Sequence, residues 1–147
     1  MDLALPVNKV RITNNQIKRY SGQINLKKIS ITGQKKIIDS NILIIGLGGL
    51  GTPALAYLAR SGVECFGIAD PDKVSISNLH RQILYDQKDL KKSKAEVSKK
   101  KILLTNSKIK IKTFKSKITK NNIDKIAKDY DVILDGTDSF ISKLTIS

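Results

Sequence analysis

The residues with the clearest chemical potential form the segment Gly46-Leu47-Gly48-Gly49-Leu50-Gly51, which lies between an apolar run and a helix-like stretch. Glycine lets the backbone approach a phosphate closely, and a helix start offers free N–H groups to an anion. Asp70 follows nineteen residues after Gly51, where a carboxylate can accept hydrogen bonds from both hydroxyls of a ribose. The spacing predicts a nucleotide-binding turn. A ligand-free tight turn, with Asp70 only capping the turn that follows it, is the alternative.

A second group of polar residues follows closely and reads Ser77-Asn78-Leu79-His80-Arg81-Gln82. Asn78 and Gln82 can both donate and accept hydrogen bonds, and Arg81 can grip a phosphate with two parallel N–H groups. We expect Ser77, Asn78, Arg81 and Gln82 to contact the nucleotide. His80 is the single histidine and has no metal ligand near it in the sequence, so we expect a polar surface or core residue.

Three further charged residues are candidates for the same site. Asp72 could act through a magnesium ion or simply cap a turn. Lys94 begins an expected helix, although with Lys91 and Lys92 beside it a solvated lysine run is an equally good interpretation. Asp138 follows an expected strand and would suit Mg²⁺ that bridges phosphates, or it could cap the segment after it.

The elements that must position these side chains alternate along the chain. Apolar periodicity predicts strands at residues 42–45, 65–69, 109–114 and 131–135, and helices at 33–39, 50–61, 93–104 and 122–128. This alternation predicts an α/β fold with a parallel sheet, and right-handed crossovers give the strand order 3-2-1-4 of a Rossmann-like, doubly wound sheet. We expect residues 1–40 to form a helical lead-in and residues 41–147 to form the nucleotide-binding half.

Composition limits the classes of function. The chain has 147 residues, of which 40% are apolar, and this is enough for one sizeable core. No apolar run approaches the roughly 20 residues of a membrane span, and the N-terminus lacks the pattern of a secretory signal, so we expect a cytoplasmic protein. Cys65 is the only cysteine, which excludes an internal disulfide and a four-cysteine zinc site. We expect Cys65 to be a buried core thiol.

The net charge of +14 raises the question of nucleic-acid binding. Only four of the 27 cations are arginines, and the lysines are scattered without interleaved aromatic residues for base stacking. A solvated lysine-rich surface is therefore favoured over a nucleic-acid interface, and attraction of an acidic partner protein or polyphosphate remains open.

Several spaced motifs together carry a family resemblance. They are Arg19-Tyr20, the segment 46–53, Ala69-Asp70-Pro71-Asp72, the segment 77–84, Lys94, and Asp135-Gly136-Thr137-Asp138. From about residue 17 onward the chain resembles the ThiF/MoeB/HesA adenylyltransferases, the bacterial relatives of the ubiquitin-activating enzymes. Gly-Thr-Pro at 51–53 is most similar to ThiF.

The resemblance implies an activity, cofactors and a partner. Such enzymes use ATP and Mg²⁺ to join AMP to the C-terminal glycine of a ubiquitin-like sulfur-carrier protein ending in Gly-Gly, in thiamine, molybdopterin or another biosynthesis. By position, Gly49 would lie beneath the nucleotide and Asp70 would hold the ribose. Asn78, Arg81 and Lys94 would hold phosphates, with Asp138 at the metal. The resemblance thus implies Arg81, Lys94 and Asp138 as the catalytic residues.

The chain also departs from the family pattern. Gly22 stands where the family has an arginine that reaches across a dimer to the partner's ATP, and Ser139 and Lys143 replace an asparagine and an arginine. The family continues well beyond residue 147, which implies a sheet incomplete at the C-terminus and either a homodimer or pairing with a missing C-terminal half. An inactive nucleotide-binding module or truncated fragment is therefore the main alternative. An NAD-dependent dehydrogenase is disfavoured by the cluster at 78–82.

Overall fold

The computed structural model describes residues 11–138, and the chain divides into two compact units, Met1–Lys36 and Ile37–Ser147. The first unit contains α1 (Asn14–Arg19) and α2 (Ser21–Ile24), and α3 (Ser30–Asp39) begins in it. A capping box starts α1: the Thr13 hydroxyl accepts from the Gln16 N–H at 3.2 Å, and the Gln16 side chain accepts from the Thr13 N–H at 2.9 Å. Periodicity had predicted neither α1 nor α2, because both are too short to show an apolar stripe.

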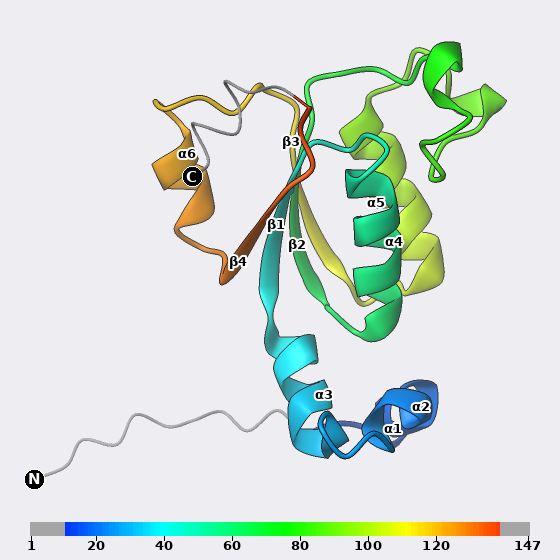
Figure 1. The fold of residues 1–147 in the computed structure, drawn as a ribbon, viewed down its shortest axis with the longest axis vertical. Coiled ribbons are helices and arrows are strands. Elements are labelled where there is room, and N and C mark those ends of the chain that lie inside the picture. The colour runs from blue at the N-terminus through cyan, green and yellow to red at the C-terminus, as the bar shows by residue number, and fades with distance from the viewer. Residues whose placement is uncertain (1–10, 139–147) are drawn as a thin grey trace, which may run out of the picture. The chain divides into compact units, whose positions relative to one another are not determined.

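The second unit is built on a four-stranded parallel sheet with the order β3-β2-β1-β4 (Figure 1). Its strands are β1 (Asn41–Ile45), β2 (Cys65–Ala69), β3 (Lys110–Phe114) and β4 (Val132–Asp135). In the register of the sheet, Ile42 lies between Phe66 and Val132. The predicted Rossmann-like α/β class and the order 3-2-1-4 are confirmed.

Helices cover both faces of this sheet (Figure 1). On one face lie α4 (Gly51–Ser61) and α5 (Lys94–Thr105), and on the other lies α6 (Ile123–Ala127). Because successive strand residues point to opposite faces, Ile42 and Ile44 join one apolar cluster and Leu43 and Ile45 join the other. The central strand β1 is thus apolar throughout, as a strand covered on both faces must be.

Local signals placed the ends of α4 correctly. Pro53 lies in its first turn, and Gly62 closes it with a left-handed φ of 112°, which glycine adopts without a steric penalty. The prediction of a buried thiol is wrong for Cys65. This free cysteine is partly exposed, because it is the first residue of β2 and lies at the margin of the sheet.

Residues 71–92 form a long, largely irregular connection between β2 and α5. It contains two short 3₁₀ helices, η1 (Ile76–Asn78) and η2 (Gln87–Asp89). Its apolar residues Val74 and Tyr85 are buried against Val97 of α5, so the connection has a small core of its own. None of the helices within residues 11–138 has the length and apolar character needed to cross a membrane.

Candidate functional site

A pocket of about 990 Å³ lies at the carboxyl ends of the strands, within the second unit. Its wall is formed by the glycine-rich loop, the ends of β2 and β4, the polar segment after η1, the start of α5 and the segment after β3. The lining residues are Ile45, Gly46, Gly48, Gly49, Leu50, Ala69, Asp70, Pro71, Asp72, Asn78, Arg81, Gln82, Lys94, Ser116, Lys117, Ile118, Gly136, Thr137 and Asp138. Open parallel sheets bind ligands at this edge, where the strand order reverses.

Two glycines of the loop are required by close backbone packing. Gly46 has a φ of 87°, and a Cβ placed there would lie 2.9 Å from the backbone of Gly136. A Cβ on Gly51 would lie 1.8 Å from the Gly46 carbonyl oxygen. Gly51 is buried and does not line the pocket, so its role is to let α4 start directly against the loop.

The other two glycines face the pocket. In the described part of the chain, the N–H groups of Gly48 and Gly49 have no hydrogen-bond partner. A Cβ on Gly49 would lie 3.5 Å from Cδ of Arg81, which shows that the arginine side chain lies against this glycine. Two unpaired N–H groups beside a guanidinium form an arrangement suited to binding an anion.

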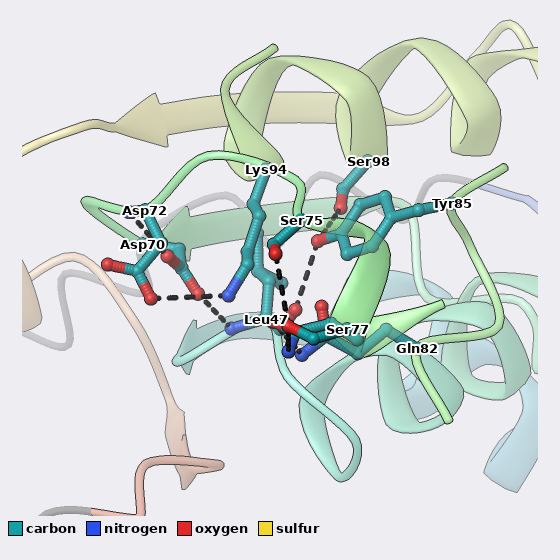
Figure 2. A network of polar contacts seen from close by, with 10 residues as sticks. Leu47, Asp70, Asp72, Ser75, Ser77, Gln82, Tyr85, Lys94 and Ser98 are labelled. Carbon is teal, nitrogen blue, oxygen red and sulfur yellow. Dashed lines mark hydrogen bonds and ion pairs between the residues drawn. The ribbon is translucent and has the colours of Figure 1, made fainter. Parts of the chain in front are cut away.

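Asp70 is 4% exposed and lies at the end of β2. Its Oδ2 accepts from the Leu47 N–H at 2.6 Å, and its Oδ1 accepts from the Asp72 N–H at 2.8 Å (Figure 2). Burial raises the pKa of Asp70, and these two hydrogen bonds and the charge of Lys94 act in the opposite direction. Asp70 therefore caps the following turn and also fixes the glycine-rich loop at the pocket wall.

Lys94 lies at the first position of α5 with its side chain only 6% exposed. Its Nζ lies 3.2 Å from Oδ2 of Asp72, whose side chain is 67% exposed (Figure 2). Lys94 is thus separated from the exposed Lys91 and Lys92, and it is not part of a solvated run. The pair places a cation at the pocket wall with an anion holding it there.

The segment 77–82 is divided by the fold. Asn78, Arg81 and Gln82 line the pocket, whereas Ser77 does not: its hydroxyl contacts Ser75 at 3.0 Å, outside the lining. Gln82 is 2% exposed, and its Nε2 donates to Oδ1 of Asn78 at 3.1 Å. Among the described residues its Oε1 has no hydrogen-bond partner, so this acceptor is available to a donor on a ligand.

The loop after β4 completes the wall. Asp135 accepts from the Thr137 N–H at 2.9 Å and caps this turn, and Asp138 is exposed at the pocket. Within residues 11–138, no three or more His, Cys, Asp or Glu side chains are grouped so that they could hold a metal ion. An all-protein metal cage is therefore not formed there, but Mg²⁺ commonly binds through one carboxylate and substrate phosphates, and Asp138 fits that arrangement.

Sequence reasoning missed part of the wall. Ser116, Lys117 and Ile118 follow β3 and line the pocket, and Ile118 is buried. The available signal was their position just beyond the carboxyl end of a parallel strand, the same rule that identified Asp138. His80 is exposed and lies outside the lining. The departures at Ser139 and Lys143 lie outside the described residues.

Comparison of the sequence with known proteins finds relatives that carry the name adenylyltransferase. The chain is 46% identical over 129 residues to a probable molybdopterin-synthase adenylyltransferase of Porphyra purpurea, covering 88% of this chain and 34% of that protein. It is 42% identical to the sulfur carrier protein ThiS adenylyltransferase of Escherichia coli, covering 88% of this chain and 51% of that protein. The chain thus spans about a third to a half of the length of these relatives.

Comparison with solved structures also finds proteins that share this fold. The structure of TcdA (CsdL) superposes with a TM-score of 0.85 at 26% identity, covering 92% of this chain and 53% of that one. The E. coli tRNA N6-threonylcarbamoyladenosine dehydratase TcdA has been solved in complex with ATP, and this structure superposes with a TM-score of 0.81 at 25% identity over 92% of this chain and 55% of that one.

The family whose sequence pattern matches this chain is described as the ThiF family, and the match runs over residues 20–147. The match includes pocket-lining residues that the fold brings together, namely Gly46, Gly48, Gly49, Asn78, Arg81, Gln82, Lys94 and Asp138. The chain belongs to the ThiF family.

Proposed function

We propose that this chain is the ATP-binding part of an adenylyltransferase that activates the C-terminal glycine of a ubiquitin-like sulfur-carrier protein. The observation that carries the proposal is the convergence at one pocket of two unpaired loop N–H groups, Arg81, Lys94 and Asp138. Relatives at 42–46% identity carry the name adenylyltransferase, and a fold relative has been solved with ATP.

The roles of the residues follow from their positions. The Gly48 and Gly49 N–H groups, Arg81 and Lys94 offer positive charge to phosphate oxygens. Asp70, at the end of β2, is the residue that would accept hydrogen bonds from the ribose hydroxyls, with Gln82 Oε1 as a further acceptor. Asn78 holds Gln82 in position through their 3.1 Å hydrogen bond.

The reaction requires positioning and charge neutralisation. A carboxylate oxygen of the carrier attacks the α-phosphorus of ATP, the bond to the β-phosphate oxygen breaks, and pyrophosphate leaves with the acyl adenylate remaining. Both reactants are anions, so the cations of the pocket lower the barrier by offsetting repulsion and by fixing the phosphates in line. No covalent intermediate with a protein residue is needed.

Magnesium is the second cofactor that we propose. A magnesium ion held at this site would supply positive charge to offset the charge that develops on the leaving pyrophosphate. Asp138 is the carboxylate that would hold it, because it is exposed at the pocket beside the loop after β4.

The test is ATP–pyrophosphate exchange with the purified chain, with and without a carrier protein ending in Gly-Gly. We expect exchange that depends on the carrier and on Mg²⁺, and its loss in Arg81→Ala. MgATP binding measured by calorimetry accompanies the assay. If the chain binds MgATP but never exchanges pyrophosphate, the catalytic proposal is wrong and the alternative of an inactive nucleotide-binding module stands.

A second experiment addresses the part of the relatives' length that this chain does not span. Because the chain spans about half or less of its relatives, a second polypeptide or a second copy of this chain could contribute to the surface that binds the carrier protein. A homodimer is one form of this proposal. Sedimentation with and without the carrier would show a 1:1 or 2:2 complex if the chain alone suffices, and no complex if further structure is required.

A further inference from the structure

The peptide groups on both sides of Leu47 are held by side chains that come from two different parts of the chain. The Leu47 N–H donates to Oδ2 of Asp70 at 2.6 Å, and the Leu47 carbonyl accepts from the hydroxyl of Tyr85 at 3.0 Å (Figure 2). Leu47 itself is fully buried. The middle of the glycine-rich loop is therefore fixed by hydrogen bonds on its N–H side and on its carbonyl side.

Tyr85 lies in the connection 71–92, is 6% exposed and does not line the pocket. Its oxygen also lies 3.1 Å from the hydroxyl of Ser98 on α5. A phenol has a single proton, and Tyr85 gives it to the Leu47 carbonyl, so Ser98 must donate to Tyr85. Burial raises the pKa of Tyr85, which keeps this proton in place at any physiological pH.

These contacts close into a ring around the loop. Leu47 is joined to Asp70, Asp70 to the Asp72 N–H, and Asp72 to Lys94 at 3.2 Å. One helical turn after Lys94 comes Ser98, which leads through Tyr85 back to Leu47 (Figure 2). The ring thus links the loop that presents free N–H groups to the helix that carries the pocket lysine.

The geometry of the peptide bond transmits this restraint to the pocket. In a trans peptide the carbonyl and the following N–H point in opposite directions. Holding the Leu47 carbonyl on Tyr85 therefore directs the Gly48 N–H away from Tyr85, and this N–H has no partner among the described residues. Losing the hydroxyl would let this peptide rotate, because glycine imposes little restraint of its own.

We propose that Tyr85, supported by Ser98, is a positioning residue that orients the Gly48 N–H for nucleotide phosphate and holds the glycine-rich loop in register with Lys94. The inference rests on the proposed function for its ligand. It assigns an indirect role in phosphate binding to a tyrosine that lies outside the pocket wall.

The test compares Tyr85→Phe with Tyr57→Phe, a matched control that removes the hydroxyl of a residue of α4 that is 70% exposed. Calorimetry measures MgATP and adenosine binding at a temperature where circular dichroism shows both variants folded. We expect Tyr85→Phe to weaken MgATP binding about fivefold and to leave adenosine binding unchanged, since one neutral hydrogen bond is lost. Tyr57→Phe should match the original chain. Equal affinity for MgATP in both variants, or an equal loss for MgATP and adenosine, overturns the inference.

Two further measurements separate this inference from the proposed function. Amide hydrogen exchange on the ligand-free chain should be faster at Leu47 to Gly51 in Tyr85→Phe, and unchanged exchange there contradicts the positioning role whatever the ligand. Ser98→Ala keeps the Tyr85 ring and should weaken MgATP binding about twofold to threefold, so it replaces Tyr85→Phe if that variant does not fold. If the unaltered chain binds no MgATP, the proposed function fails; faster exchange in Tyr85→Phe would then still show the loop restraint.

Discussion

Arg81 and Asp138 are exposed side chains at the pocket, and neither makes an ion pair within residues 11–138. Their charges are therefore not used by the fold that the structure describes. Arg81 makes a single 3.4 Å contact with the Ser77 carbonyl and lies along Gly49. A side chain at a ligand site that makes few contacts within the fold contributes little to stability. Its removal should therefore affect binding more than stability.

The first prediction concerns these two residues. Arg81→Ala should weaken MgATP binding by about tenfold to a hundredfold, because it removes charge-assisted hydrogen bonds to phosphate. Asp138→Ala should weaken MgATP binding but not binding of ATP without Mg²⁺. His80→Ala is the control, since His80 is exposed in the same segment and does not line the pocket. Isothermal calorimetry measures these affinities. Unchanged affinity for MgATP in both Arg81→Ala and Asp138→Ala would show that the site has been placed wrongly.

Among elements, the glycine-rich loop and α4 depend on each other through Gly51. A Cβ at Gly51 would lie 1.8 Å from the Gly46 carbonyl oxygen, which is backbone and cannot move aside cheaply. A Cβ at Gly48 would meet only Nε2 of Gln82, at 3.8 Å, an ordinary contact distance. Gly51 is therefore required by close backbone packing, whereas packing does not require a glycine at position 48.

The second prediction follows from that difference. Gly51→Ala should lower the free energy of unfolding by about 3 kcal/mol, the upper part of the range for overpacking. Gly48→Ala should cost less than about 1 kcal/mol of stability while weakening MgATP binding, since its methyl group would face the phosphates. Urea denaturation and calorimetry separate the two effects. Equal stability loss in both variants would contradict the packing argument.

A cluster of charges attaches the connection 71–92 to α5. Lys101 Nζ lies 2.6 Å from Oδ2 of Asp86 and 2.8 Å from Oδ2 of Asp89, and Asp89 is buried. The hydrogen bond from Lys101 holds the pKa of Asp86 below its ordinary value of 3.8. Burial alone would lower the pKa of Lys101, but the bonds to Asp86 and Asp89 raise it above 10.5. This cluster fixes the segment that supplies Tyr85 and Arg81.

The third prediction is the pH dependence of this cluster. The stabilisation from Asp86 is present above its unfolded pKa of 3.8 and is lost as pH falls through the lower folded pKa. The stabilisation from Lys101 is present below its unfolded pKa of 10.5, and it is lost as the pH rises through the higher folded pKa. Lys101→Met should therefore lower the urea midpoint between about pH 5 and 9, and the difference from the original chain should shrink below about pH 4.

The control for this prediction is Lys88→Met. Lys88 lies 3.5 Å from the same Asp86 oxygen, but its side chain is 78% exposed, so its ion pair is weakened by solvent. Its removal should change the urea midpoint little at any pH. A difference between Lys101→Met and the original chain that stays constant from pH 3 to 7 would show that the lysine acts through packing alone.

On the scale of the whole molecule, β4 is an edge strand in the described sheet. It pairs with β1 on one side, and Val132 is 45% exposed. An exposed strand edge with an apolar side chain favours pairing with another chain. This chain covers only a third to a half of the length of its relatives, which is consistent with a sheet that additional strands could extend.

The fourth prediction is that this edge drives self-association. Val132→Lys should reduce concentration-dependent association in size-exclusion chromatography with light scattering, because a charged side chain on an edge strand opposes pairing. Leu104→Lys is the matched control, since Leu104 is 80% exposed but lies on α5. An equal reduction in both variants would point to general charge repulsion and away from the strand edge.

The sequence by itself determined the fold of the second unit, because each signal was local or followed from a general rule of chain handedness. A continuous apolar run, the glycine spacing and helical apolar periodicity located β1, the loop and α4 within a residue or so, and right-handed crossovers set the strand order. Asp70 and Asp138 could be placed at the pocket because both follow parallel strands.

The tertiary structure alone decided how side chains from distant segments meet. It buried Lys94 against Asp72, left Ser77 outside the pocket, brought residues 116–118 into the wall and placed the Tyr85 hydroxyl on the Leu47 carbonyl. Each of these contacts depends on the path of the connection 71–92 or of the loop after β3, and that path is fixed by packing and hydrogen bonds between residues far apart in sequence. No periodicity within either segment encodes it.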